Sequence, residues 1–283
     1  MNDYEVLATD FSQVGIDNYD PTVWTPEEVM ARDPQHYGVL EPESQEVSQD
    51  IIDIVKEQRE EAESSGAEFY NGPLIRVQDH EVEDGKLNLN IQNTNYFSHV
   101  GTRKRPELVK KDRADPLSVG AHLITSDNYL VLGERSGLVE LGGGEYQLAG
   151  AGFIEDPELQ YERSLNAQPS SPIHREIEEE VNLDQTQITG PVPSALIGAV
   201  HRQPMLIYET ETVLDSEEVR DEWLEIDQDE KEFSELLFLP EEDITQALEG
   251  KTDVLIADNE GIKNERYEGE LRPHARGAIE TLN

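Results

Sequence analysis

The chain has 283 residues and carries 62 acidic against 22 basic side chains, which gives a formal net charge of −40. It contains no cysteine, which excludes disulfides, zinc–thiolate sites, iron–sulfur clusters and cysteine nucleophiles. Such a negative chain is unsuited to nonspecific binding of DNA, RNA or anionic membranes, and its apolar runs are too short to cross a bilayer, so we expect a cytoplasmic protein without such partners.

Residues 1–66 form an acidic segment with few signs of regular structure, interrupted by prolines and anchored only by Trp24. After Pro42, apolar residues recur at helical spacing, and Gly66 then provides a stop. These apolar residues are Val47, Ile51, Ile54 and Val55. The pattern predicts one helix in this segment.

Residues 67–115 favour extended structure. The short apolar run 74–77 predicts one strand, and apolar residues that alternate with polar ones over 87–91 predict a second. Asp84 and Gly85 between them are typical of a hairpin turn. We therefore expect a small β-rich unit at residues 67–115, followed by the main domain at residues 116–283.

Basic residues gather at positions 103–113, which hold six of the 22 in the chain. Arg103, Lys104 and Arg105 begin this run and are candidates for binding the phosphates of an anionic substrate. A linker that pairs with the acidic surface is the alternative.

Acidic residues are otherwise spread along the whole chain, and arginine outnumbers lysine by 14 to 8. Proteins from a very salty cytoplasm have this character, because a short Debye length screens the self-repulsion that would loosen the fold. We therefore expect a halophilic protein.

From residue 116 onward, turns and alternating apolar runs are typical of one compact domain. A turn at 126–128 separates the first two strands, and a glycine-rich passage at 141–152 precedes a helix. The predicted strands are 119–125, 129–135, 195–200, 205–212 and 236–239, and the predicted helices are 172–182 and 241–249.

The helix predicted at 172–182 has one apolar stripe to bury, formed by Ile173, Ile177 and Val181. Asn182 can take the left-handed conformation at its end.

The same helix carries the most chemistry. At about 100° per residue, three of its glutamates fall within an arc of roughly 100°, opposite the direction of Glu178. These three are Glu176, Glu179 and Glu180. Their carboxylates repel one another, and Mg²⁺, which prefers oxygen ligands, would relieve that repulsion. In such an acidic chain, a solvated helix face is the alternative.

The residues around this helix resemble the signature of the Nudix hydrolase family. That signature is a glycine, five residues and a glutamate, then a spacer of seven and the block Arg-Glu-apolar-any-Glu-Glu-any-Gly-apolar. Gly152 and Glu158 have the first spacing, and residues 175–183 match the block except that Asn182 takes the glycine position. The spacer after Glu158 has sixteen residues, and Glu155 is a competing candidate for its role. The resemblance implies an α/β/α sandwich around a mixed sheet.

The resemblance also implies a metal site and a catalytic set. Glu176, Glu179 and Glu180, with Glu158, would hold Mg²⁺, or Mn²⁺ in its place. Arg175 is expected to pair with Glu179 one turn later and to orient that carboxylate. The candidates for the general base are Glu232 and Glu235, of which Glu235 better fits the family pattern.

Shorter motifs at 70–73 and 97–102, together with the long spacer, resemble the family members that cleave UDP-glucose and UDP-galactose. This implies hydrolysis of a UDP-hexose to UMP and a sugar 1-phosphate. ADP-ribose or a dinucleotide as substrate, a catalytically silent nucleotide-binding sensor, and a plain interaction domain are the alternatives. A homodimer is left open.

Overall fold

The computed structural model describes residues 4–23, 53, 72–103, 108, 113–136, 144–154, 165–166, 171–199, 203–227, 231–249, 251, 253–267 and 269–282. The helix predicted after Pro42 lies outside these residues except for Asp53. Four candidate site residues also lie outside them: Lys104, Arg105, Glu155 and Glu158.

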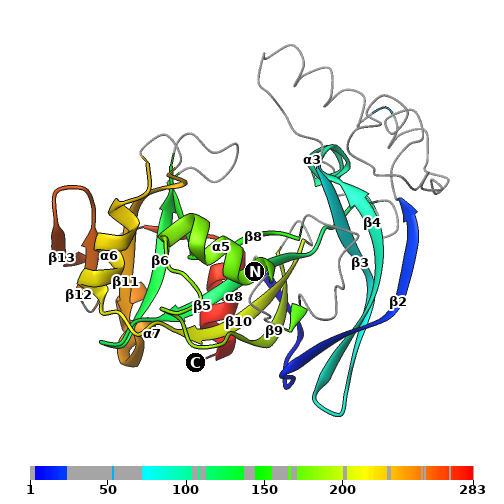
Figure 1. Ribbon diagram of the computed structural model, residues 1–283, viewed down its shortest axis with the longest axis horizontal. Helices are drawn as coiled ribbons and strands as arrows, with labels where there is room; N and C mark the ends of the chain where they lie inside the picture. The colour runs from blue at the N-terminus through cyan, green and yellow to red at the C-terminus, as the bar shows by residue number, and fades with distance from the viewer. Residues whose placement is uncertain are drawn as a thin grey trace.

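The described residues form a mixed α/β structure around one large, mostly antiparallel sheet (Figure 1). Its strands are β1 (Tyr4–Ala8), β5 (Ser118–Ile124), β6 (Tyr129–Arg135), β7 (Glu145–Leu148), β8 (Gly152–Phe153), β9 (Val192–Ala199), β10 (Pro204–Glu211), β11 (Phe233–Pro240), β12 (Asp253–Ala257), β13 (Ile262–Arg266) and β14 (Glu270–Leu271). The main path runs β1-β9-β10-β5-β6-β11-β12-β13. β10 pairs with β5, and β14 with β7, in parallel, so the sheet is mixed, as predicted.

Helices cover both faces of this sheet. α5 (Pro172–Val181) and α6 (Ser216–Leu224) lie on one face; α8 (Pro273–Leu282) and α7 (Ile244–Leu248), which follows the short 3-10 helix η2 (Glu241–Asp243), lie on the other. Along β6, Val131 shares one core with Ile177 of α5, whereas Leu130 and Leu132 share the other core with Ile279 of α8. None of the described helices is long and apolar enough to cross a membrane.

α6 occupies a stretch in which the sequence shows mainly acidic residues. The Asp215 side chain accepts a hydrogen bond from the Glu218 N–H at 2.9 Å, and the Glu218 carboxylate accepts one from the Asp215 N–H at 3.0 Å. This reciprocal cap satisfies two backbone donors at the start of the helix. Val219 and Trp223, one turn apart, are buried against α5 and the sheet. Only these two apolar residues mark the buried face of α6, so the acidic residues around them leave no clear helical pattern in the sequence.

A second sheet of three strands lies beside the large one and carries the predicted hairpin. It consists of β2 (Gln13–Val23), β4 (Lys86–Asn95) and β3 (Pro73–Glu83), and α3 (Tyr96–Arg103) follows β4. Asp84 and Gly85 have φ values of 51° and 74°, which a tight hairpin turn requires. Ile75 and Leu89 belong to the same hydrophobic cluster as Leu117 and α5, so this unit packs on the main domain through a continuous core.

The first described residues differ from the loosely built segment expected there. β1 pairs antiparallel with β9 of the large sheet, and β2 pairs in parallel with β4 of the small one. The partners of both strands are distant in sequence, so no local turn signal marks them. Residues 4–23 therefore join the two sheets.

Asn182 ends α5 in the left-handed conformation, as predicted, with φ 60° and ψ 32°. Its backbone N–H donates to the Glu178 carbonyl at 2.9 Å, and its side-chain amide donates to the Glu222 carbonyl of α6 at 3.1 Å. The residue therefore both ends the helix and ties it to α6.

We expect Asn182→Ala to be less stable than Asn182→Gly by about 1 kcal/mol, because alanine pays the steric cost of the left-handed conformation and glycine does not. Both variants lose the amide contact to α6, so the difference between their free energies of unfolding reports the backbone conformation at position 182. Denaturant unfolding in molar KCl measures it. Equal stabilities of the two variants would contradict the left-handed helix end.

Candidate functional site

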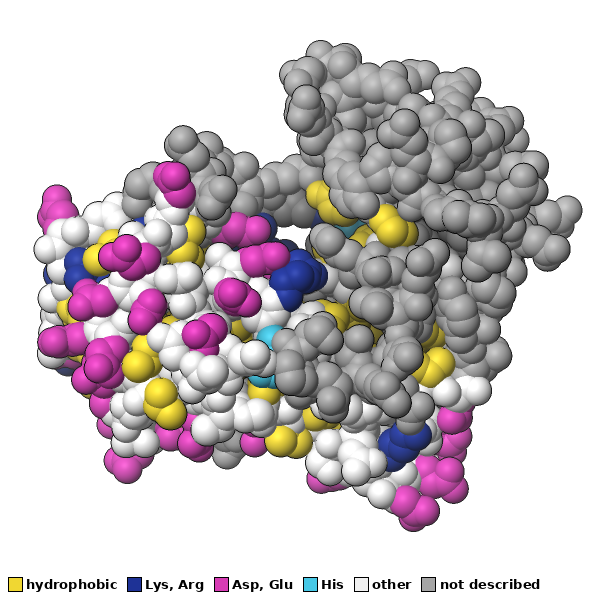
Figure 2. Space-filling model, viewed as in Figure 1, with side chains coloured by type: hydrophobic (Ala, Val, Ile, Leu, Met, Phe, Trp, Pro, Cys, Tyr) yellow, Lys and Arg dark blue, Asp and Glu magenta, His cyan; other side chains and the backbone are white. Residues whose placement is uncertain are grey.

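A cavity of about 350 Å³ lies where α5, α3 and the segment before α8 meet at the large sheet. The residues of its wall that matter for chemistry are Tyr96, His99, Arg103, Arg135, Gln147, Gly152, Phe153, Arg175, Glu176, Glu179, Glu232, Arg272 and His274. In the space-filling view acidic side chains are spread over the described surface, whereas basic ones are few and some gather beside a hollow near the centre (Figure 2). The cavity is therefore more cationic than the rest of the chain.

Arg175 organises the carboxylates at the mouth of this cavity. Its guanidinium lies 2.6 Å from Glu176 Oε1 and 3.0 Å from Glu179 Oε2, and it donates to the Phe153 carbonyl at 3.1 Å. The predicted pair with Glu179 is thus confirmed, and the contact with Glu176 adds a second. Because Phe153 belongs to β8, the same side chain fixes both carboxylates relative to the sheet.

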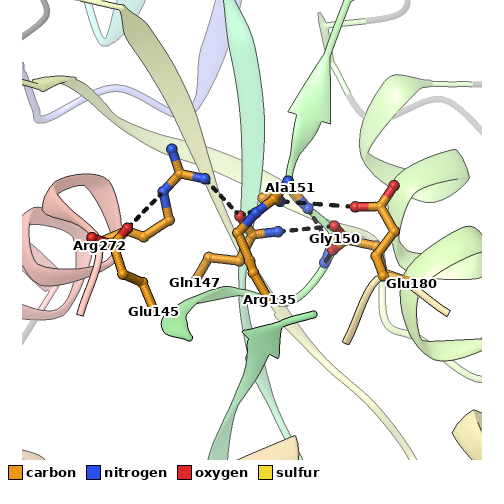
Figure 3. Close-up of polar contacts among 8 residues, drawn as sticks. Arg135, Glu145, Gln147, Gly150, Ala151, Glu180 and Arg272 are labelled. Atoms are coloured by element: carbon orange, nitrogen blue, oxygen red, sulfur yellow. Dashed lines mark hydrogen bonds and ion pairs between the residues drawn. The ribbon is translucent and has the colours of Figure 1, made fainter. Parts of the chain in front are cut away.

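Glu180 lies behind these two carboxylates and is buried. Its carboxylate accepts hydrogen bonds from the backbone N–H groups of Gly150 at 2.5 Å and Ala151 at 2.9 Å, and from Gln147 Nε2 at 3.0 Å (Figure 3). Burial raises the pKa of Glu180 well above its usual range, and the negative charges of Glu232 and Glu176 raise it further. Glu232 and Glu176 therefore each lie close enough to Glu180 to repel its carboxylate.

Glycines make room for the carboxylates of α5. A Cβ atom on Gly152 would lie 2.2 Å from the carboxyl carbon of Glu176, and one on Gly150 would lie 2.5 Å from Ile177 Cγ1. Gly150 also has a φ of 72°, which a side chain would strain. The end of the glycine-rich passage therefore admits the helix closely enough for Gly150 and Ala151 to hold Glu180.

The carboxylates of α5 could supply part of the ligand shell of a magnesium ion. Among the described residues, no three acidic or histidine side chains converge tightly enough to hold a metal ion by themselves. Mg²⁺ commonly takes one or two carboxylates and completes its shell with water and substrate phosphate oxygens. Glu176 and Glu179 on the cavity wall, with Glu180 behind them, could offer such a set, and a cation would relieve the repulsion between Glu176 and Glu180.

Three arginines reach the cavity from separate segments. Arg103 ends α3, Arg135 ends β6 and Arg272 precedes α8. Arg103 was a candidate from the basic run, but Arg135 and Arg272 were not, because each stands alone in sequence and only the fold brings them together. Burial lowers the pKa of Arg272, and the positive charges of Arg135 and Arg103 lower it further, so the three are near neighbours.

Aromatic rings form another part of the wall. Tyr96 and His99 of α3 pack edge-on against Phe153, with ring centroids 6.3 Å and 5.1 Å away. These rings come from both the N-terminal unit and the main domain, so the cavity depends on their packing.

The two general-base candidates have different surroundings. Glu232 lines the cavity, with Oε2 3.8 Å from Arg135 Nη1. Glu235 is not among the residues that line it, and instead accepts a hydrogen bond from the Tyr146 hydroxyl. Burial raises the pKa of Glu235. Geometry therefore favours Glu232, contrary to the preference for Glu235 from the sequence pattern.

No protein-family model matches the chain, and no curated protein is similar to it in sequence. Among solved structures, DR0079 from Deinococcus radiodurans is similar with 19% identity and a TM-score of 0.28. The similarity covers 37% of this chain and 63% of that protein, so it spans less than two thirds of the latter. At this TM-score it supports no inference about the site.

The buried carboxylate predicts a pH-dependent stability difference in the metal-free protein. The pKa of Glu180 in the folded protein is raised above 4.5. The stability that Glu180 contributes through this shift is therefore fully present below the pKa of the unfolded state, and it is lost as pH rises through the pKa of the folded state. We therefore expect wild type to lose stability relative to Glu180→Gln as pH rises above about 4.5. Denaturant unfolding in molar KCl with chelator measures this.

Glu178→Gln, on the exposed side of the same helix, controls for the removal of one charge. If the stability difference between wild type and Glu180→Gln were constant with pH, or equal to that of the control, the burial of Glu180 as a charged group would be refuted.

Proposed function

We propose that the chain is a Nudix-type hydrolase that cleaves nucleoside diphosphate-linked substrates with Mg²⁺. The favoured substrate is a UDP-hexose, which would yield UMP and a sugar 1-phosphate. The observation that carries the proposal is the joint tethering of Glu176 and Glu179 by Arg175 on the wall of a cavity that also presents Arg103, Arg135 and Arg272. Carboxylates for a divalent cation and arginines for phosphate are the two requirements of a diphosphate site.

The position of each residue in the cavity suggests its proposed role. Glu176, Glu179 and Glu180 would hold Mg²⁺, which supplies charge neutralisation at the diphosphate and lowers the pKa of a bound water. Arg175 would keep the first two carboxylates in place. Tyr96 and Phe153 offer ring surfaces to the nucleoside or sugar.

The reaction consumes one water per diphosphate. The water oxygen attacks one phosphorus, the bridging P–O bond breaks, and the leaving phosphate keeps the bridging oxygen. Glu232, at the cavity wall, would take the proton of the attacking water. This assigns no proton transfer to Glu235, whose carboxylate is engaged by Tyr146.

Activity can be tested with UDP-glucose, UDP-galactose, ADP-ribose and dinucleoside polyphosphates, each incubated with Mg²⁺ in molar KCl. We expect UMP and sugar 1-phosphate from the UDP-hexoses, and a loss of at least a hundredfold in turnover for Glu179→Gln, because a ligand carboxylate is removed. Glu178→Gln, on the same helix, should retain turnover. Product analysis by ion-exchange chromatography checks both.

Cleavage of only ADP-ribose or a dinucleotide would change the assigned substrate but would still support diphosphate hydrolysis. Binding of UDP-glucose without any UMP would favour the nucleotide-binding sensor, and no binding of any nucleotide would favour a plain interaction domain.

The two base candidates can be separated by matched variants. We expect Glu232→Gln to lower kcat by about a hundredfold, the scale of general-base catalysis, and Glu235→Gln to lower it by less than tenfold. Steady-state kinetics on the best substrate, with unfolding midpoints as the control for folding, measure both values. A larger loss of kcat in Glu235→Gln than in Glu232→Gln would identify Glu235 as the general base.

A further inference from the structure

The cavity concentrates arginine in a chain that has little of it. Of the described residues that line it, four are arginine and three are glutamate, although acidic residues outnumber basic ones almost threefold in the chain. One of these, Arg175, is engaged by Glu176 and Glu179. The other three line the cavity from the end of α3, the end of β6 and the residue before α8, and Arg272 lies near both of the others.

Gln147 holds two of these arginines by a single atom. Its Oε1 accepts hydrogen bonds from Arg135 Nη1 at 2.8 Å and Arg272 Nη1 at 3.5 Å, while its Nε2 donates to Glu180 (Figure 3). Arginine only donates and an ionised carboxylate only accepts, so the amide has one orientation that satisfies both sides. Gln147, a neutral amide, thus orients two guanidinium groups.

Each of these two arginines also has one carboxylate within ion-pair distance. Glu232 Oε2 lies 3.8 Å from Arg135 Nη1, and Glu145 Oε2 lies 3.9 Å from Arg272 Nε. Both distances exceed the usual hydrogen-bond length of about 3 Å. His274, beside Arg272, adds no positive charge near neutral pH, because burial lowers its pKa to about 4. Among the described residues of this part of the cavity wall, the positive charge therefore comes from arginine.

From this arrangement we infer that Arg135 and Arg272, oriented by Gln147 and assisted by Arg103, form a phosphate subsite that binds a phosphoryl group without any metal ion. Planar guanidinium groups from two directions suit the tetrahedral oxygens of phosphate. Direct contacts of this kind persist at molar salt, where a Debye length of about 3 Å removes long-range attraction. The role of the subsite in cleavage rests on the proposed function, whereas its binding of phosphate does not.

The test uses inorganic phosphate as the probe, titrated into the full chain in molar KCl with chelator and followed by calorimetry. We expect wild type to bind phosphate, and Arg135→Gln and Arg272→Gln to bind it at least tenfold more weakly. Arg272→Lys, which keeps the charge but loses the planar fork, should also weaken binding. Arg276→Gln, on α8 outside the cavity lining, is the matched control and should bind as wild type does.

Absence of phosphate binding in wild type, or equal binding by wild type and Arg272→Gln, would overturn the subsite. Phosphate binding that depends on both arginines, in a protein that hydrolyses no diphosphate, would support the subsite and refute the proposed function. Hydrolysis with a KM unchanged by Arg272→Gln would support the function and refute the subsite. Thermal unfolding of each variant confirms that it is folded.

Discussion

The buried carboxylate of Glu180 is the contact on which the geometry of the site depends. It accepts two backbone N–H groups from the end of the glycine-rich passage and one amide from β7, so it fixes α5 against the sheet by polar contacts as well as by its apolar stripe. A charged group in this position is costly without partners, and its raised pKa reflects that cost. Once Glu180 is fixed, the spacing of the helix sets where Glu176 and Glu179 emerge, and Arg175 then holds them. The passage that accommodates this carboxylate needs glycine because larger residues would meet the helix.

The layers of the fold bring opposite charges to one cavity. α5 approaches from one face of the large sheet, the segment before α8 approaches from the other, and α3 arrives from the three-stranded unit. Gln147 lies where these meet, with its oxygen toward arginine and its nitrogen toward Glu180. A single neutral amide therefore lies between the Glu180 carboxylate and two of the arginines. We propose that this arrangement is where the strongly acidic protein accepts an anion.

Sequence reasoning was successful where the signal is local. The stripe of Ile173, Ile177 and Val181, the left-handed Asn182 and the Asp84-Gly85 turn all follow from neighbouring residues, and the structure has each of them. The glutamate face of α5 and its partner Arg175 follow from helical spacing in the same way. Arg135, Arg272 and Gln147 could not be found, because nothing in sequence links three single residues that tertiary structure brings together. β1 and β2 were missed for the same reason. The choice between Glu232 and Glu235 stays a prediction, on which the sequence pattern and the cavity lining differ.

The pairing of Tyr4 in β1 with Ala199 in β9 matters for how the chain acquires its structure. During synthesis β1 leaves the ribosome long before its partner exists, and contacts this distant in sequence form slowly. β1 can pair with β9 only after residues 192–199 have been synthesised. Between the synthesis of β9 and its pairing with β1, the exposed edge of β9 can pair with any extended segment nearby, including β1 of another nascent copy.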